Sequence, residues 1–286
     1  MDPAASRTEP TRGIAAFFDV DNTVIRGASA YHIARGLHRR GYLRTGTILR
    51  FAWQQIKYVL FGEKAIGVNK VRSEALSIIK GWSVAEMASI GEEIYDEVIV
   101  HRIFPGTKGL LDAHLARGHE VWLVTATPVE IGNLIAKRLG ATGALGTRAE
   151  TSRGYYTGAL IGDLLHGEAK ATAVTKLAEE RGLSLEDSFA YGDSTNDIPL
   201  LKTVGFACAI NPEHRLRRRA KKWGWAIRDF RGKRSNGRRS LAASTAAGAL
   251  WVTIVILRGL TAPIRGLFRR LLWWRRKPSP KSEASD

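Results

Sequence analysis

The stretch AAFFDVDNTVIRG, residues 15–27, places two carboxylates directly after a short apolar run. The run IAAFF, residues 14–18, predicts a buried strand. Asp19 and Asp21 follow at its end, where two like charges in a partly dry site repel each other. We therefore expect a cation to share this site, or the two carboxylates to take part in a reaction.

Strand-like and helical patterns alternate along the chain up to about residue 211. Apolar runs typical of strands return three times, at residues 119–127, 188–193 and 205–211. Helical patterns separate them, and residues 28–103 read as mostly helical. Strands that alternate with helices predict an α/β fold, a doubly wound parallel sheet with a Rossmann-like core. TSRGYYTGAL (151–160) predicts a small hairpin, and WAIRDF (225–230) predicts a last short strand.

Polar side chains follow the predicted strands. Thr125 lies in TATP, Asp193 and Asp197 lie in GDSTND, and Lys170 lies in GEAK at the start of a helix. The carboxyl ends of parallel strands meet at one edge of a sheet, where the sites of such folds form. We therefore expect these groups to join Asp19 at that edge.

Four carboxylates that converge require a cation, and carboxylate oxygens are ligands that Mg²⁺ prefers. We therefore expect Mg²⁺ as the cofactor, with Asp19, Asp21, Asp193 and Asp197 as candidate ligands. A hydroxyl, a lysine and the amides of a helix N-terminus form a phosphate pocket. The chemistry that follows is phosphoryl transfer, with Asp19 as nucleophile and Asp21 as proton donor to the leaving group.

Four segments, DVDNT, LVTAT, the lysine of GEAK and YGDSTND, resemble the ordered motifs of the haloacid dehalogenase superfamily. The resemblance is closest to its phosphoserine-phosphatase-like branch, subfamily IB, in which a helical cap is inserted between the first and second motifs. It covers about residues 14–211. All four motifs occur in order, which makes the resemblance specific.

The resemblance implies a role at each matching position. Asp19 would form an aspartyl-phosphate. Asp21 would act as general acid and then as base, with its backbone carbonyl on magnesium. Thr125 and Lys170 would hold the phosphoryl group, and Asn196 would help to position the phosphate or the substrate.

The same resemblance implies that Asp193 ligates magnesium and that Asp197 supports it from close by. The sequence departs from the phosphoserine phosphatases at two points. Ala28 stands where they carry a glutamate that reads the amino group of the substrate, and TAT (125–127) replaces their Ser-Gly-Gly. Arg72 or Lys70 is the candidate for the cap residue that reads the substrate carboxylate. These changes keep the phosphatase chemistry and leave the substrate open.

The charge of the chain is concentrated at its C-terminal end. The formal net charge is +17, and residues 212–286 carry 20 Lys and Arg against 4 Asp and Glu. Within this region, residues 240–257 form an uncharged run close to the length of a membrane span. Residues 263–277, PIRGLFRRLLWWRRK, combine arginines with apolar and Trp side chains, which is typical of a helix at an anionic lipid surface. The pattern favours membrane association and leaves a spanning and an interfacial tail equally open.

We therefore expect a disordered tail at 1–13, a catalytic core at 14–27 and 104–232, a helical cap at 28–103, and a basic, apolar membrane-associating tail at 233–286. The expected function is a magnesium-dependent phosphomonoester phosphatase at the cytoplasmic, inner face of the plasma membrane. Its substrate would be a small phosphomonoester or a lysophospholipid phosphate. The single cysteine, Cys208, fits a reducing compartment, and the N-terminus has no secretory signal pattern.

Two alternatives remain open at this point. One is a phosphoserine phosphatase of serine biosynthesis. The other is a non-catalytic basic adaptor that binds a membrane or nucleic acid. Nucleic acid is the weaker partner, because the apolar run that follows the basic segments fits lipid better. The oligomeric state and the pathway are not predicted.

Overall fold

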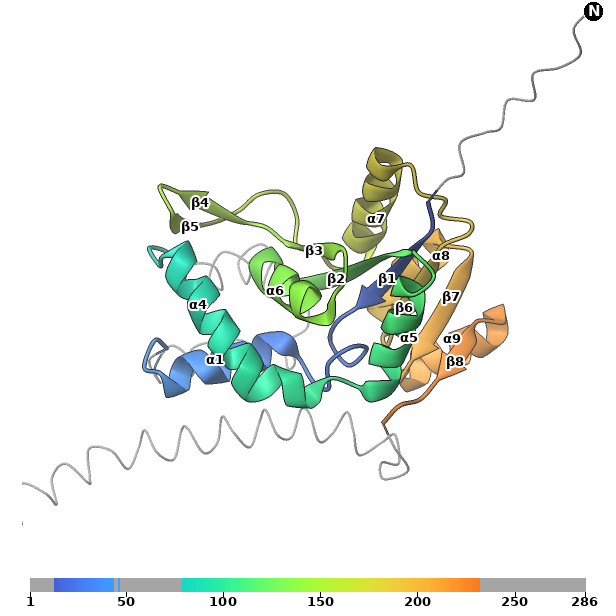
Figure 1. The fold of residues 1–286 in the computed structure, drawn as a ribbon, viewed down its shortest axis with the longest axis horizontal. Helices are drawn as coiled ribbons and strands as arrows, with labels where there is room; N and C mark the ends of the chain where they lie inside the picture. Colours follow the sequence, from blue (N-terminus) through green and yellow to red (C-terminus); the bar gives the residue numbers. More distant parts are fainter. Residues whose placement is uncertain (1–12, 44–45, 47–78, 232–286) are drawn as a thin grey trace, which may run out of the picture.

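The computed structural model describes residues 13–43, 46 and 79–231 (Figure 1). Most of the two predicted tails lies outside this part, including the uncharged run 240–257. Arg72 and the middle of the predicted cap also lie outside it. No helix in the described part of the chain combines the length and the apolar character needed to cross a lipid bilayer.

A six-stranded sheet forms the centre of the molecule, with strand order β3-β2-β1-β6-β7-β8 and every neighbouring pair parallel. Its strands are β1 (Ala15–Asp19), β2 (Glu120–Pro128), β3 (Gly143–Thr147), β6 (Phe189–Gly192), β7 (Phe206–Ile210) and β8 (Ala226–Arg228). The first strand, β1, lies between β2 and β6 near the middle of the sheet. This confirms the predicted parallel α/β core.

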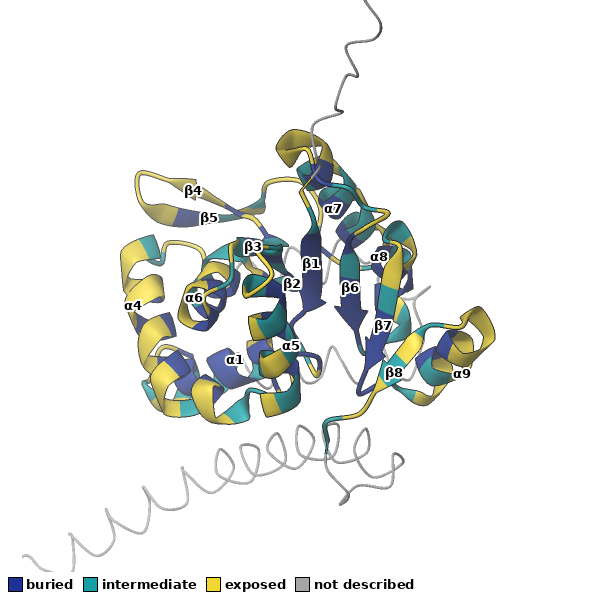
Figure 2. Ribbon diagram, turned by 45° about the vertical axis from the view of Figure 1, so that its right-hand side comes forward, coloured by how far each residue is buried: buried dark blue, intermediate teal, exposed yellow. Residues whose placement is uncertain are grey.

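Helices cover both faces of the sheet, because alternate residues of each strand point to opposite sides. Ala16 and Phe18 of β1 pack on the face of α5 and α6, whereas Ala15 and Phe17 pack on the face of α7, α8 and α9. These helices are α5 (Pro105–Leu115), α6 (Val129–Leu139), α7 (Glu168–Arg181), α8 (Ile198–Thr203) and α9 (His214–Trp223). The core is therefore two apolar layers that are separated by a sheet buried on both faces (Figure 2).

The remaining helices lie to one side of the sheet. They are α1 (Ser29–Arg39) and α4 (Val84–Ile94), which continues as a π-helix (Tyr95–Ile99) and a 3-10 turn (Val100–Arg102). A Cβ atom on Gly36 would lie 2.6 Å from the Ile94 side chain, so the glycine allows α1 and α4 to pack closely. The described helices agree with the predicted helical character of 28–103, and the division into core and cap stays a prediction.

The predicted hairpin is present as β4 (Ala149–Ser152) and β5 (Tyr155–Leu160). Its backbone also bonds to the segment before α4: Gly81 N–H donates to the Tyr156 carbonyl at 2.8 Å, and Tyr156 N–H donates to the Trp82 carbonyl at 3.0 Å. The hairpin therefore joins the helices beside the sheet rather than the sheet itself.

One strand was not predicted. The edge strand β3 has the sequence GALGT, which lacks an apolar run and contains two glycines. Glycine is depleted in strands, so the segment carries no local signal. Pairing with β2 and packing of Ala144 against α6 hold it in the sheet.

Candidate active site

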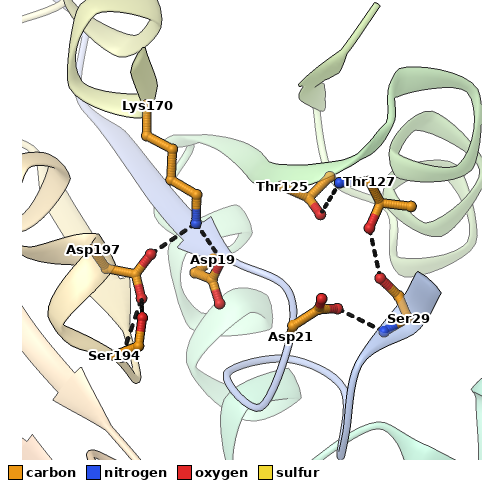
Figure 3. A network of polar contacts seen from close by, with 8 residues as sticks. All are labelled: Asp19, Asp21, Ser29, Thr125, Thr127, Lys170, Ser194 and Asp197. Atoms are coloured by element: carbon orange, nitrogen blue, oxygen red, sulfur yellow. Dashed lines mark hydrogen bonds and ion pairs between the residues drawn. The ribbon is translucent and has the colours of Figure 1, made fainter. Parts of the chain in front are cut away.

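Three strands end where the polar residues of the motifs begin. Asp19 is the last residue of β1, Thr125 lies in the second half of β2, and Asp193 follows β6 directly. The strands are parallel, so these residues reach the same edge of the sheet, as the sequence predicted. Figure 3 shows Asp19 and Thr125 at this edge.

Lys170 enters this edge from the first turn of α7. Its side chain is buried, with 3% of the residue exposed, and its Nζ lies 2.5 Å from Asp19 Oδ1 and 2.7 Å from Asp197 Oδ1. The Lys170 ammonium thus bridges Asp19, the candidate nucleophile, and Asp197 of the fourth motif (Figure 3). Charge-assisted bonds of this length fix the position of both carboxylates.

Asp197 is held from its other side by the loop that follows β6. Its Oδ2 accepts bonds from Ser194 N–H at 3.1 Å and from Ser194 Oγ at 3.0 Å, and the two residues form a capping box. A Cβ atom on Gly192 would lie 2.6 Å from the Asp197 Cβ, so this loop requires a glycine there. Both carboxylate oxygens of Asp197 therefore already have donors within the protein.

Asp19, Asp193 and Asp197 form the acidic cluster of the site. Each offers an oxygen within 4.8 Å of those of the other two. Burial, followed by repulsion from neighbouring carboxylates, raises the pKa of Asp19 to about 7 and raises the pKa of Asp193 well above its ordinary value. Burial alone would lower the pKa of Lys170, but the carboxylates of Asp19 and Asp197 outweigh it and raise the pKa. Among the described residues, the three carboxylates therefore share one cation, the ammonium of Lys170.

Asp21 lies outside this cluster of three. Its Oδ1 accepts a bond of 2.8 Å from the backbone N–H of Ser29, the first residue of α1, so the carboxylate faces that helix N-terminus (Figure 3). The Ser29 hydroxyl lies 2.7 Å from the hydroxyl of Thr127, and Thr127 N–H donates to Thr125 Oγ1 at 3.1 Å. A chain of bonds therefore joins Asp21 to the second motif.

Asn211 connects the loop after β1 to the C-terminal end of the described chain. Its Nδ2 donates to the Asn22 carbonyl at 3.0 Å, and its Oδ1 accepts from Phe230 N–H at 2.7 Å. Both asparagines have positive φ, 59° at Asn22 and 47° at Asn211, a conformation that asparagine tolerates better than most residues. Asn211 is buried, so both amide groups are used inside the protein.

Glu213 holds the loop of the fourth motif. Its backbone N–H donates to the Asp193 carbonyl at 2.9 Å, and its Oε1 accepts from Thr195 N–H at 2.9 Å. Glu213 is the N-cap of α9, so the loop that carries Asp193 is attached to the start of that helix.

The structure brings most of the predicted site residues to one edge. Asn196 lies in the 3-10 turn Thr195–Asp197 with its side chain exposed, and Arg72 lies outside the described residues. Sequence reasoning missed four residues that hold the others in place: Ser29, Ser194, Asn211 and Glu213. The Ser194 capping box could have been found from the STND pattern, whereas the contacts of the others join segments that are distant in sequence.

The fold and the site define a class of protein: a parallel α/β enzyme with a buried aspartate and a lysine at the carboxyl edge of its sheet. A family model described as haloacid dehalogenase-like hydrolase matches residues 16–202. The chain belongs to this family, which confirms the resemblance seen in the motifs.

Particular relatives narrow the class. A phosphoserine phosphatase of Mycobacterium tuberculosis is 50% identical over 236 residues, covering 82% of this chain and 77% of the relative. A histidinol-phosphatase of Neisseria meningitidis is 30% identical over 220 residues, covering 76% and 98%. A crystal structure of a protein of unknown function from Bordetella pertussis matches with a TM-score of 0.69 and 30% identity, covering 77% of this chain and all of that one. The chain is thus a phosphatase, and the adaptor alternative is set aside.

Proposed function

We propose that the protein is a magnesium-dependent phosphatase that acts on small phosphomonoesters through an aspartyl-phosphate on Asp19. The observation that carries the proposal is the buried bridge from Lys170 to Asp19 and Asp197, beside Asp193 and at the end of the strand that precedes Asp21. A lysine placed there offsets the charge of the nucleophile and of the phosphate that approaches it.

In the proposed reaction, a carboxylate oxygen of Asp19 attacks phosphorus while the bond from phosphorus to the leaving oxygen breaks. Asp21 donates a proton to that oxygen, and it then removes a proton from the water that cleaves the acyl phosphate. The backbone N–H of Ser29 fixes one oxygen of Asp21 and leaves the other for this proton transfer. Thr125 and Lys170 hold the phosphoryl oxygens, and Asn196 stands at the exposed rim of the site.

The residues present fit a magnesium ion. The cluster contains carboxylate oxygens without a nitrogen or sulfur ligand, which is the donor set of a hard cation. Burial and mutual repulsion disfavour the charged forms of Asp19 and Asp193, and one lysine does not balance three carboxylates. We propose that Asp19 and Asp193, with the backbone carbonyl of Asp21, hold the ion, and that Asp197 supports the site through Lys170. A bound ion would polarise the phosphoryl oxygens and offset the charge that develops on them.

For the substrate, the name of the 50% identical relative favours phosphoserine. The other named relative acts on histidinol phosphate, so similarity alone selects no single ester. Ala28 is the exposed N-cap of α1, and no carboxylate stands at that position to pair with an amino group. A lysophosphatidate-like lipid is the second candidate. It rests on the apolar cap stretch 48–61 and on the tail, both of which lie outside the described residues.

The test is to compare kcat/KM of the purified protein for phosphoserine, histidinol phosphate and a short-chain lysophosphatidate. Chelation should abolish hydrolysis of each, and added Mg²⁺ should restore it. A rate unchanged by chelation would refute the metal proposal. A tenfold or greater preference for phosphoserine over the lipid would remove the lipid candidate.

We further propose that the tail at 233–286 associates with the inner face of the membrane. The support is the sequence alone: an uncharged run at 240–257, followed by the basic and aromatic segment 263–277. Fractionation of cells that express the full chain tests this proposal. Recovery of all the protein without membranes at physiological salt would contradict it.

A further inference from the structure

The helix α9 has an unusual charge for a helix of a folded domain. Six of its ten residues, HRLRRRAKKW, are Lys or Arg, and it contains no acidic residue. Its inner side consists of Leu216 and Ala220, which are fully buried against the sheet. Its other residues are mostly exposed and are coloured yellow on the ribbon of α9 in Figure 2. The exposed basic side chains are Arg215, Arg218, Arg219, Lys221 and Lys222.

Within the part of the chain that the structure describes, no ion pair reaches the five exposed cations of α9. Within residues 13–43, 46 and 79–231, Arg217 is the member of α9 that has an ion pair, with Asp229 at 2.7 Å. Asp229 also pairs with Arg231 at 2.6 Å, so even this carboxylate is shared between two cations. Five exposed cations on one helix create a local positive potential that attracts an anionic partner.

An aromatic group stands at the end of the same surface. Trp223 is 38% exposed although it is a large apolar residue, and its ring centroid lies 4.8 Å from that of Trp225. Lys202 Nζ, from the neighbouring helix α8, lies 4.7 Å from the centroid of the Trp223 ring. An indole next to cations matches the headgroup zone of a bilayer, where Trp and basic side chains gather.

We propose that the outer side of α9, together with Trp223 and Lys202, is a docking surface for the headgroups of an anionic phospholipid bilayer. The inference deepens the membrane association of the proposed function and rests on it, but it places part of the binding on the folded enzyme instead of on the tail. Continuity supports lipid as the partner, because the chain that leaves this surface at Arg231 goes on to the uncharged run 240–257. Binding of nucleic acid would not explain an uncharged run of this length.

The surface also has a defined relation to the active site. Glu213, the N-cap of α9, bonds to the backbone of Asp193 and Thr195 in the loop of the fourth motif. A bilayer on α9 would therefore lie next to the element that carries the acidic cluster. Docking would fix the orientation of the active-site edge relative to the lipid surface.

The test uses the full-length protein and vesicles with or without phosphatidylglycerol. The first variant is the triple change Arg215→Gln, Arg218→Gln and Arg219→Gln on exposed positions of α9. The matched control removes the same charge from other exposed positions, Lys137→Gln, Arg148→Gln and Lys176→Gln. Each basic residue near an anionic surface contributes roughly a fivefold factor to partitioning, so the α9 variant should bind anionic vesicles about a hundredfold more weakly than the control.

Hydrolysis of a small soluble ester should be the same in all three proteins, which shows that the variants fold. Equal vesicle binding by the α9 variant and the control would overturn the inference while leaving the tail as the membrane anchor. No vesicle binding by the unaltered chain would overturn both. Loss of binding to single-stranded RNA without loss of vesicle binding would assign the surface to nucleic acid and refute the lipid proposal.

A second measurement reads the surface directly. Cys208 is the single cysteine of the chain and is buried, so an engineered cysteine can be labelled selectively. A polarity-sensitive dye on Arg219→Cys should shift to the blue on anionic vesicles, whereas the same dye on Lys176→Cys should not. An equal response, or none, at both positions would contradict docking through α9.

Discussion

Two largely buried polar clusters pack against the same sheet and are built in opposite ways. The cluster proposed to be catalytic, called the catalytic cluster below, consists of Asp19, Asp193, Asp197 and Lys170 and contains three carboxylates for one ammonium. The histidine cluster consists of His114, His119 and Tyr191. His114 Nε2 lies 2.7 Å from the Tyr191 hydroxyl, and His114 Nδ1 lies 3.0 Å from His119 Nδ1.

The histidine cluster is neutral, and aromatic side chains pack around it. The Tyr191 ring stacks on Phe18 with a centroid distance of 4.2 Å, and the His114 ring lies 4.7 Å from that of Phe189. Burial, with smaller contributions from the neighbouring His119 and Arg117, lowers the pKa of His114 to about 4. This cluster therefore stabilises the fold as long as it stays uncharged.

The difference in charge between the two clusters indicates a different role for each. Buried groups that are satisfied by neutral partners contribute to stability, whereas buried like charges oppose it and persist where chemistry needs them. Changes in the catalytic cluster should therefore remove activity with little loss of stability. Changes in the histidine cluster should do the reverse.

The largest expected effect tests the first half of this comparison. Asp19→Asn should lower kcat by at least two to four orders of magnitude, because an amide is a far weaker nucleophile than a carboxylate. It also removes one of three repelling charges, so the urea midpoint without Mg²⁺ should stay the same or rise. Steady-state kinetics and urea titration of the same preparation check both. Near-normal turnover by the folded variant would refute the nucleophile assignment.

The second effect concerns the metal. Asp193→Ala should raise the Mg²⁺ concentration needed for half-maximal activity by about a hundredfold or more, because a hard cation loses a carboxylate ligand. A magnesium titration of activity measures this. Glu213→Gln is the control, since it alters the same loop and leaves the carboxylate of Asp193 in place. An unchanged magnesium requirement in the Asp193 variant would remove it from the ligand set.

The third effect tests the histidine cluster by pH. The pKa of His114 lies near 4 in the folded protein and near 6.5 when unfolded, so the unfolded state takes up the proton first. Stability from this group is complete above pH 6.5 and is lost as the pH falls towards 4, by about 3 kcal/mol in total. Burial raises the pKa of Asp19 to about 7, so the folded state takes up this proton before the unfolded state does. In the presence of a chelator, the contribution of Asp19 to the free energy of unfolding therefore rises as the pH falls, opposite to that of His114.

Comparison of the metal-free unaltered protein with metal-free His114→Gln isolates the contribution of His114 to the pH dependence of stability. Glutamine does not titrate, and Asp19 is the same in both proteins. The difference between their free energies of unfolding should shrink as the pH falls from 7 to 5, and hydrolysis at pH 7.5 should be unchanged. A parallel pH dependence in the two proteins would show that His114 does not control acid stability.

The smallest expected effect lies where Asp21 meets the N-terminus of α1. Ser29→Ala removes a hydroxyl bond to Thr127 but keeps the N–H bond to Asp21, so kcat should change by less than about fivefold. Ser29→Pro also removes the N–H, at a first helical position where proline is tolerated. It should lower kcat by about tenfold and shift its pH profile. Equal effects of both substitutions would show that the N–H does not position Asp21.

The sequence predicted the parts of the molecule that have a local signal. Apolar runs located four central strands, and the polar residues after three of them located the candidate site. The edge strand β3 was missed because GALGT depends on its neighbour for its structure. The roles of all the candidate site residues, including the exposed Asn196 and the cap residue Arg72, stay predictions.

The supporting residues were missed for a different physical reason. The contact from Ser29 to Thr127 spans 98 residues, and the contact from Asn211 to Asn22 spans 189. A serine at the start of a helix, like Ser29, and an asparagine after a strand, like Asn211, are both common and carry no special signal in the sequence. Their roles arise from tertiary contacts, which a pattern along the chain does not contain.

The bond from Phe230 N–H to Asn211 Oδ1 has a spectroscopic consequence. The amide proton of Phe230 is held by the same side chain that fixes the Asn22 carbonyl beside Asp21. Exchange of this proton with deuterium therefore requires that the bond from Phe230 N–H to Asn211 Oδ1 break. Deuterium exchange at the Phe230 amide therefore reports how firmly Asn211, which also binds the loop after β1, is held, and the measurement needs neither substrate nor a substitution in the candidate site.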